Sequence, residues 1–75
     1  MSFRINFTLN RRQYNAQVAE ESINGSHLWV VEVDNGGTYL FSKEVKGWHC
    51  AELGKDTCQV IGKAIDTGLA ELQPM

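Results

Sequence analysis

Hydrophobic and polar residues alternate strictly at the start of the chain. Phe3, Ile5, Phe7 and Leu9 are separated by single polar residues, which is the period of a strand that buries only one face. Comparable segments follow up to residue 50, interrupted by short clusters of Asn, Gly and charged residues. Such clusters are typical of hairpin turns, so the pattern predicts five consecutive antiparallel strands.

The predicted turns determine which residues lie opposite one another. Asn24-Gly25 is the strongest signal, because both central positions of a type I′ turn need positive φ. A turn at Arg11-Arg12 pairs Leu9 with Tyr14, Phe7 with Ala16 and Ile5 with Val18. The turn at Asn24-Gly25 then pairs Val18 with Val31 and Ala16 with Val33. Together these pairs keep one apolar set on one face of the sheet.

The third turn, Asp34–Gly37, is ambiguous in length. A three-residue loop with a glycine bulge pairs Tyr39 with Val33 and Phe41 with Val31. A two-residue loop places Thr38 and Leu40 there instead, and we prefer the first because it keeps both aromatic residues on the buried face. The fourth turn, over residues 44–47, pairs Phe41 with Cys50 and Lys43 with Trp48.

Helical spacing replaces the strand pattern near residue 56. Asp56 is the expected N-cap, Gln59 completes a capping box, and Pro74 follows the end of the helix. Gly68 lies on the apolar stripe, which predicts a close approach to the sheet, whereas Gly62 lies off the stripe and the pattern gives no reason for it. The stripe expected to cover the sheet consists of Ile61, Ala64, Ile65, Leu69 and Leu72.

The predicted fold is therefore α+β: a five-stranded antiparallel β-meander, flat or curled, followed by one C-terminal α-helix packed on one face. The 75 residues form one small domain, 1–75. The pattern resembles that of many small bacterial domains, and no motif is specific enough to name a family. No apolar run is long enough to cross a bilayer and no export signal is present, so we expect a cytoplasmic protein.

Catalytic and metal-binding signals are weak. The cysteines, Cys50 and Cys58, lack paired zinc spacing, and His49 should point away from Cys50 because neighbouring strand residues face opposite sides. We therefore predict no metal, no cofactor, no small-molecule ligand and no enzymatic activity. The alternative is a thiol-dependent enzyme that uses Cys58, whose pKa the helix N-terminus would lower.

The second face of the sheet carries the candidate interaction surface. One helix cannot cover both faces, so an apolar patch should remain exposed there unless the sheet curls around it. The patch consists of Leu28, Val30, Leu40, Ala19 and Ala51. The first strand offers a second opening, because it is an edge strand protected by little beyond Arg4.

These features predict a non-catalytic protein–protein interaction module that self-associates as a homodimer or binds another protein. The alternative is a nucleic-acid-binding module that uses Arg4, Arg11, Arg12 and the sheet aromatics. The net charge of −2 gives no general attraction to nucleic acid. We therefore regard the nucleic-acid function as the weaker hypothesis.

Overall fold

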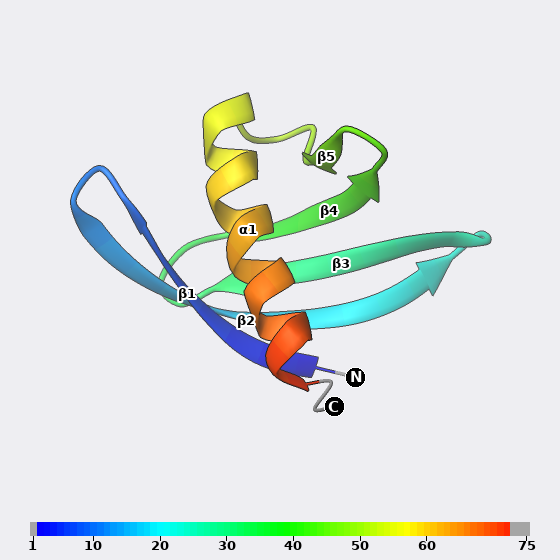
Figure 1. Cartoon of the computed structure of the whole chain (residues 1–75), viewed down its shortest axis with the longest axis horizontal. Helices are drawn as coiled ribbons and strands as arrows, with labels where there is room; N and C mark the ends of the chain where they lie inside the picture. The colour runs from blue at the N-terminus through cyan, green and yellow to red at the C-terminus, as the bar shows by residue number, and fades with distance from the viewer. Residues whose placement is uncertain (1, 73–75) are drawn as a thin grey trace.

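The computed structural model describes residues 2–72 and has the predicted α+β architecture (Figure 1). Its elements are β1 (Ser2–Leu9), β2 (Arg12–Ile23), β3 (Ser26–Val33), β4 (Thr38–Glu44), β5 (Gly47–His49) and α1 (Lys55–Leu72). The strands follow one another across an antiparallel sheet in the order β1-β2-β3-β4-β5. No helix among residues 2–72 is long and apolar enough to span a membrane.

The sheet curls around α1, which crosses its concave face and contacts the two outermost strands, β1 and β5 (Figure 1). The core lies between the helix and this face. Its buried members alternate along each strand, recur at helical spacing in α1 and include Cys50 just after β5: Phe3, Ile5, Phe7, Ala16, Val18, Trp29, Val31, Phe41, Trp48, Cys50, Cys58, Ile61 and Ile65. The predicted apolar face is therefore confirmed, except that Leu72 at the end of α1 is 44% exposed.

The first hairpin turns one residue earlier than expected. Leu9 pairs with Arg12, so Asn10 and Arg11 form the turn. Both have positive φ, 50° and 67°, as a two-residue type I′ turn requires. The predicted turn at Arg11-Arg12 is wrong, and the true pairs are Phe7–Tyr14, Ile5–Ala16 and Phe3–Val18. Because the register differs by two residues, every side chain still faces the expected side.

The next two turns show one success and one error. Asn24-Gly25 forms the second turn as predicted, with φ of 51° and 80°, and Val18–Val31 and Ala16–Val33 are paired. Both predicted pairings of the third turn are wrong: the Val33 N–H donates to the Gly37 carbonyl oxygen (3.0 Å), so only Asp34, Asn35 and Gly36 lie between the paired residues. The pairs are consequently Val31–Tyr39 and Trp29–Phe41. The buried face is again unchanged.

The last strand and the helix start need smaller corrections. Lys43 pairs with Trp48 as predicted, but Cys50 lies beyond the end of β5 and does not pair with Phe41. The helix begins at Lys55, and the Cys58 N–H donates to the Gly54 carbonyl oxygen (3.0 Å). Asp56 is therefore in the first turn and is not the N-cap, although its carboxylate still complements the helix dipole there.

Two glycines of α1 allow the helix to lie close to the sheet. A Cβ at Gly68 would come within 2.6 Å of the Phe3 ring, which confirms the predicted close approach. A Cβ at Gly62 would lie 2.6 Å from Cβ of Trp48 and closer still to its Cγ and Cδ1. Gly62 is buried, so the prediction that it lies off the apolar stripe is wrong. Its role is to accommodate Trp48.

Candidate interaction surfaces

The predicted apolar patch is present on the convex face but is smaller than expected. Ala19, Val30 and Leu40 lie side by side on β2, β3 and β4. Leu40 is 44% exposed, whereas Ala19 and Val30 are half-buried. Leu28 is also half-buried, and its neighbour on β2 is Glu21. Ala51 is exposed but follows β5, outside the sheet.

Strand β1 offers a second candidate interaction surface along its free edge. In a two-residue hairpin the residues flanking the turn form a hydrogen-bonded pair, and such pairs alternate along the ladder. Starting from Leu9–Arg12, the odd-numbered residues of β1 therefore bond to β2. The backbone N–H and C=O groups of Ser2, Arg4, Asn6 and Thr8 point the other way, where no strand pairs with β1 among the described residues.

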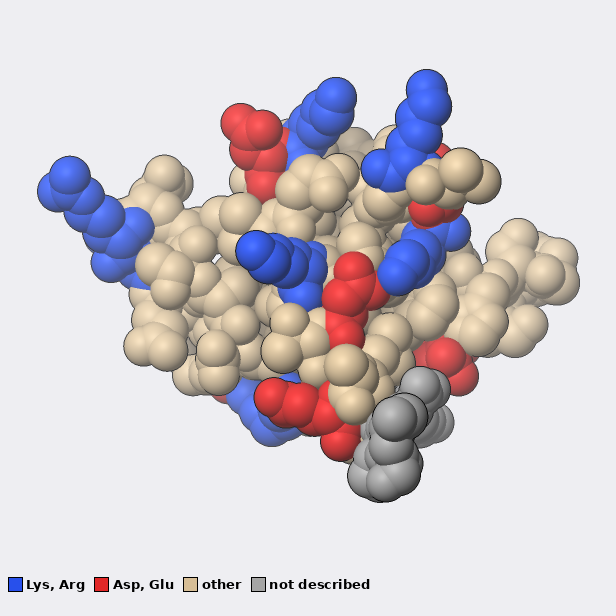
Figure 2. Space-filling view, in the orientation of Figure 1, with Lys and Arg blue, Asp and Glu red and all other residues tan. Residues whose placement is uncertain are grey.

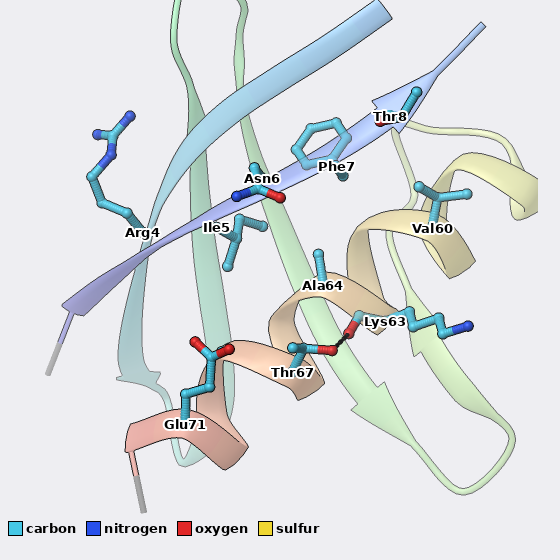
Figure 3. Close-up of a pocket in the computed structure, with 11 residues that line it drawn as sticks. Arg4, Ile5, Asn6, Phe7, Thr8, Val60, Lys63, Ala64, Thr67 and Glu71 are labelled. Carbon is cyan, nitrogen blue, oxygen red and sulfur yellow. Dashed lines mark hydrogen bonds between the residues drawn. The ribbon is translucent and has the colours of Figure 1, made fainter. Parts of the chain in front are cut away.

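A groove of about 430 Å³ runs between this edge and α1 (Figure 3). Its β1 side is formed by residues 4–8 and its α1 side by Val60, Lys63, Ala64, Thr67, Gly68 and Glu71. Val60 and Ala64 are half-buried, while Lys63, Thr67 and Glu71 are exposed. The floor of the groove is thus apolar and its helical rim is polar.

Charges in and near the groove fall into two groups. Arg4 is neutralised by an ion pair with Asp34, the residue that follows β3 and whose N–H donates to the Asn15 carbonyl oxygen (2.9 Å). Lys63 and Glu71 form no ion pair with any residue in the range 2–72. They stand two helical turns apart on the same rim, with Thr67 between them (Figure 3).

Trp48, Lys43 and Asp66 form a cluster with a structural role where α1 packs against β4 and β5. Trp29 and Trp48 meet edge to face with ring centroids 5.0 Å apart, as expected for buried core aromatics. Trp48 Nε1 donates to Asp66 (3.1 Å), and Lys43 Nζ donates to the same carboxylate (2.7 Å). Burial alone would raise the pKa of Asp66, but these two hydrogen bonds outweigh it and lower the pKa. Asp66 therefore ties α1 to β4 and β5.

The thiol alternative loses its main support. Cys50 and Cys58 are both free and buried, and Cys58 Sγ donates to the Cys50 carbonyl oxygen (3.4 Å). Burial raises the pKa of Cys58, and the hydrogen bond to the Cys50 carbonyl oxygen, which lowers it, does not cancel this rise. The expected lowering by the helix N-terminus is wrong, because loss of solvent outweighs it. Within residues 2–72, no group of three or more His, Cys, Asp or Glu could hold a metal ion.

Basic side chains do not gather into a nucleic-acid-binding surface on the face shown in Figure 2, where Lys and Arg are interspersed with Asp and Glu. The exposed Arg11 and Arg12 lie at the turn of the β1–β2 hairpin. Arg4 is engaged by Asp34, and both tryptophans are buried. The structure thus does not bring together the residues of the nucleic-acid alternative.

No protein-family model matches this chain, and neither a curated protein nor a solved structure gives a significant match. The function of the protein must therefore be inferred from its surfaces. The β1 edge was predicted from the sequence, but the Lys63, Thr67 and Glu71 rim was not. Their spacing of four residues is visible in the sequence, yet nothing there indicates which strand this side of the helix accompanies.

Proposed function

We propose that this protein is a non-catalytic protein–protein interaction module that binds an extended segment of polypeptide as a sixth strand beside β1. The observation that carries the proposal is the free edge of β1, whose outward N–H and C=O groups lie beside the groove between β1 and α1. Strand addition of this kind takes its affinity from backbone hydrogen bonds and its selectivity from pockets for alternate side chains.

The groove suits such a segment. A strand added beside Arg4–Thr8 would direct every second side chain toward the apolar floor near Val60 and Ala64. The intervening side chains would lie beside Asn6 and Thr8 on the polar convex face. Backbone pairing with the edge and side-chain contact with the floor would thus occur together.

The convex patch supports an interaction less well. Ala19, Val30 and Leu28 are already half-buried within the sheet, and Ala51 does not adjoin them on a strand. Leu40 is then the main accessible apolar side chain of the patch. Because isolated exposed apolar residues are common on monomeric proteins, we place the interaction at the β1 edge.

Asn6→Pro tests the proposal. The Asn6 N–H points outward, so proline removes a donor that the isolated domain does not use, and edge strands tolerate proline at such positions. Asn6→Ala is the matched control, because it changes the side chain but keeps the N–H. Circular dichroism and thermal unfolding would verify that both variants are folded.

The binding probe is a set of extended peptides selected from a displayed random dodecapeptide library, with the protein below micromolar concentration. On titration into ¹⁵N-labelled protein, we expect the amide signals of Ser2, Arg4, Asn6 and Thr8 to move most. Asn6→Pro should abolish binding and Asn6→Ala should retain it. Failure of the library to yield a peptide that discriminates between the two variants would reject the β1 edge as the binding site.

A further inference from the structure

We infer that the strand added beside β1 is β1 of a second copy of this chain, in an antiparallel, twofold-symmetric pair with Ile5 at the axis. In this arrangement the two α1 helices lie antiparallel on the same face, and Lys63 of each copy faces Glu71 of the other. The inference rests on the proposed function and names its partner.

The hydrogen-bonding groups of β1 select this register. With Ile5 opposite Ile5 of the second copy, Ser2 pairs with Thr8 of the second copy and Arg4 with Asn6. Each of these residues directs its N–H and C=O outward, so every outward group in the strand is used. A shift of the axis to Asn6 would leave Ser2 without a partner.

The side chains are compatible with the same register. On the helix-covered face, the two Ile5 side chains meet at the axis and Phe3 lies opposite Phe7 of the second copy, and aromatic and β-branched cross-strand pairs stabilise antiparallel sheets. On the convex face, Arg4 lies opposite Asn6 of the second copy, so no two like charges are directly opposed. Arg4 also keeps its own partner, Asp34.

The helix has its own symmetric pattern about the same point. Gly68 lies over Phe3 and Ile5, which brings the adjacent Thr67 nearest to the proposed axis. Lys63 stands one turn before Thr67 and Glu71 one turn after it, all on the groove side (Figure 3). Twofold rotation about Thr67 therefore places Lys63 opposite Glu71 of the second copy, and Glu71 opposite Lys63.

The charges of the two rims are thus self-complementary, as an isologous interface requires. Lys63 and Glu71 are exposed and form no ion pair with any other residue in the range 2–72. Pairing with the second copy would give each an opposite partner and would exclude the parallel arrangement, in which Lys63 would face Lys63. Complementary charges of this kind determine orientation and partner choice.

The test is sedimentation equilibrium at low salt, from micromolar to near-millimolar protein. We expect the wild-type chain to form a dimer. Lys63→Glu and Glu71→Lys should each weaken the dimer by about tenfold or more, because each turns two attractive contacts into repulsive ones. An equimolar mixture of the two variants should form a heterodimer near wild-type strength, since every facing pair is again opposite in charge. Lys46→Glu, in the exposed β4–β5 turn, is the matched charge-reversal control.

Each result has a defined meaning. A wild-type chain that stays monomeric throughout would overturn the inference, while the peptide titration would still test the β1 edge as a general binding site. A dimer that survives Asn6→Pro would place the contact elsewhere and would overturn it as well. A dimer that Lys63→Glu weakens no more than Lys46→Glu does, or a mixture that fails to recover, would refute the arrangement of the helices.

Discussion

Replacing Gly62 by alanine should destabilise the fold even though alanine is the better helix former. The added Cβ would lie 2.6 Å from Cβ of Trp48 and closer still to two atoms of its indole ring. Trp48 cannot easily move away, because its Nε1 is bonded to Asp66 and its ring packs against Trp29. The helix and β5 must therefore separate to admit one methyl group.

Two opposing effects determine how much stability Gly62→Ala removes. Overpacking a well-packed core costs about 1–3 kcal/mol, and this site should lie at the upper end because the clash involves atoms near the Trp48 backbone. Replacing glycine by alanine in a helix interior stabilises the helix by about 1 kcal/mol. The net loss should be about 2 kcal/mol, which lowers the Tm of a domain of this size by about 10 °C.

Urea unfolding followed by circular dichroism would measure this loss. Gly68→Ala is the matched control, because it carries the same gain in helix propensity but the atoms nearest its Cβ are ring atoms of Phe3 and, at 3.4 Å, Cγ2 of Ile5, rather than a Cβ next to the backbone. We expect Gly68→Ala to cost clearly less than Gly62→Ala. If Gly62→Ala were as stable as the wild type, the close approach of α1 to Trp48 would be refuted.

Three further predictions concern other parts of the chain. Cys58 should react with iodoacetamide at least about tenfold more slowly than free cysteine at pH 8, because burial raises its pKa, and labelling that keeps pace with free cysteine would contradict this. The lowered pKa of Asp66 means that its carboxylate stabilises the fold above the ordinary value of 3.8 and that this contribution is lost as the pH falls through the lowered value. The difference in urea stability between wild type and Asp66→Asn should therefore shrink between pH 6 and pH 2, and an unchanged difference would argue against the Lys43 contact. Arg11→Gly should stabilise the domain by about 0.5–1 kcal/mol in thermal unfolding. Arg11 adopts a φ of 67°, which is unfavourable for an L-residue, and the greater conformational freedom of glycine in the unfolded chain offsets only part of the gain. A loss of stability would contradict the type I′ turn.

The sequence predicted the faces of the sheet well and the pairing of its strands less well, for one physical reason. Side chains alternate with a period of two, so a register error of two residues changes partners but not faces. Asn24-Gly25 is the preferred chemistry for its turn, and the pairs beside it were correct. The turn at Asn10-Arg11 contains no glycine, so its positive φ angles could not be recognised from the residues.

The candidate site was predictable only in its strand half. An unprotected first strand is visible as a pattern, and the structure places it at the sheet edge as expected. The position of the helical rim beside β1 depends on the angle at which α1 crosses the sheet. That angle is set by the close contacts at Gly62 and Gly68, which join residues distant in the sequence. No local pattern encodes such a contact.

The placement of the groove also has a consequence for folding. Each strand pairs with its neighbour in the chain, so the hairpins close short loops and can form early. The contact of α1 with β1 joins the first and last elements and closes nearly the whole chain. We therefore expect the groove to be completed last, so that incompletely folded chains lack the assembled groove and with it the proposed binding site.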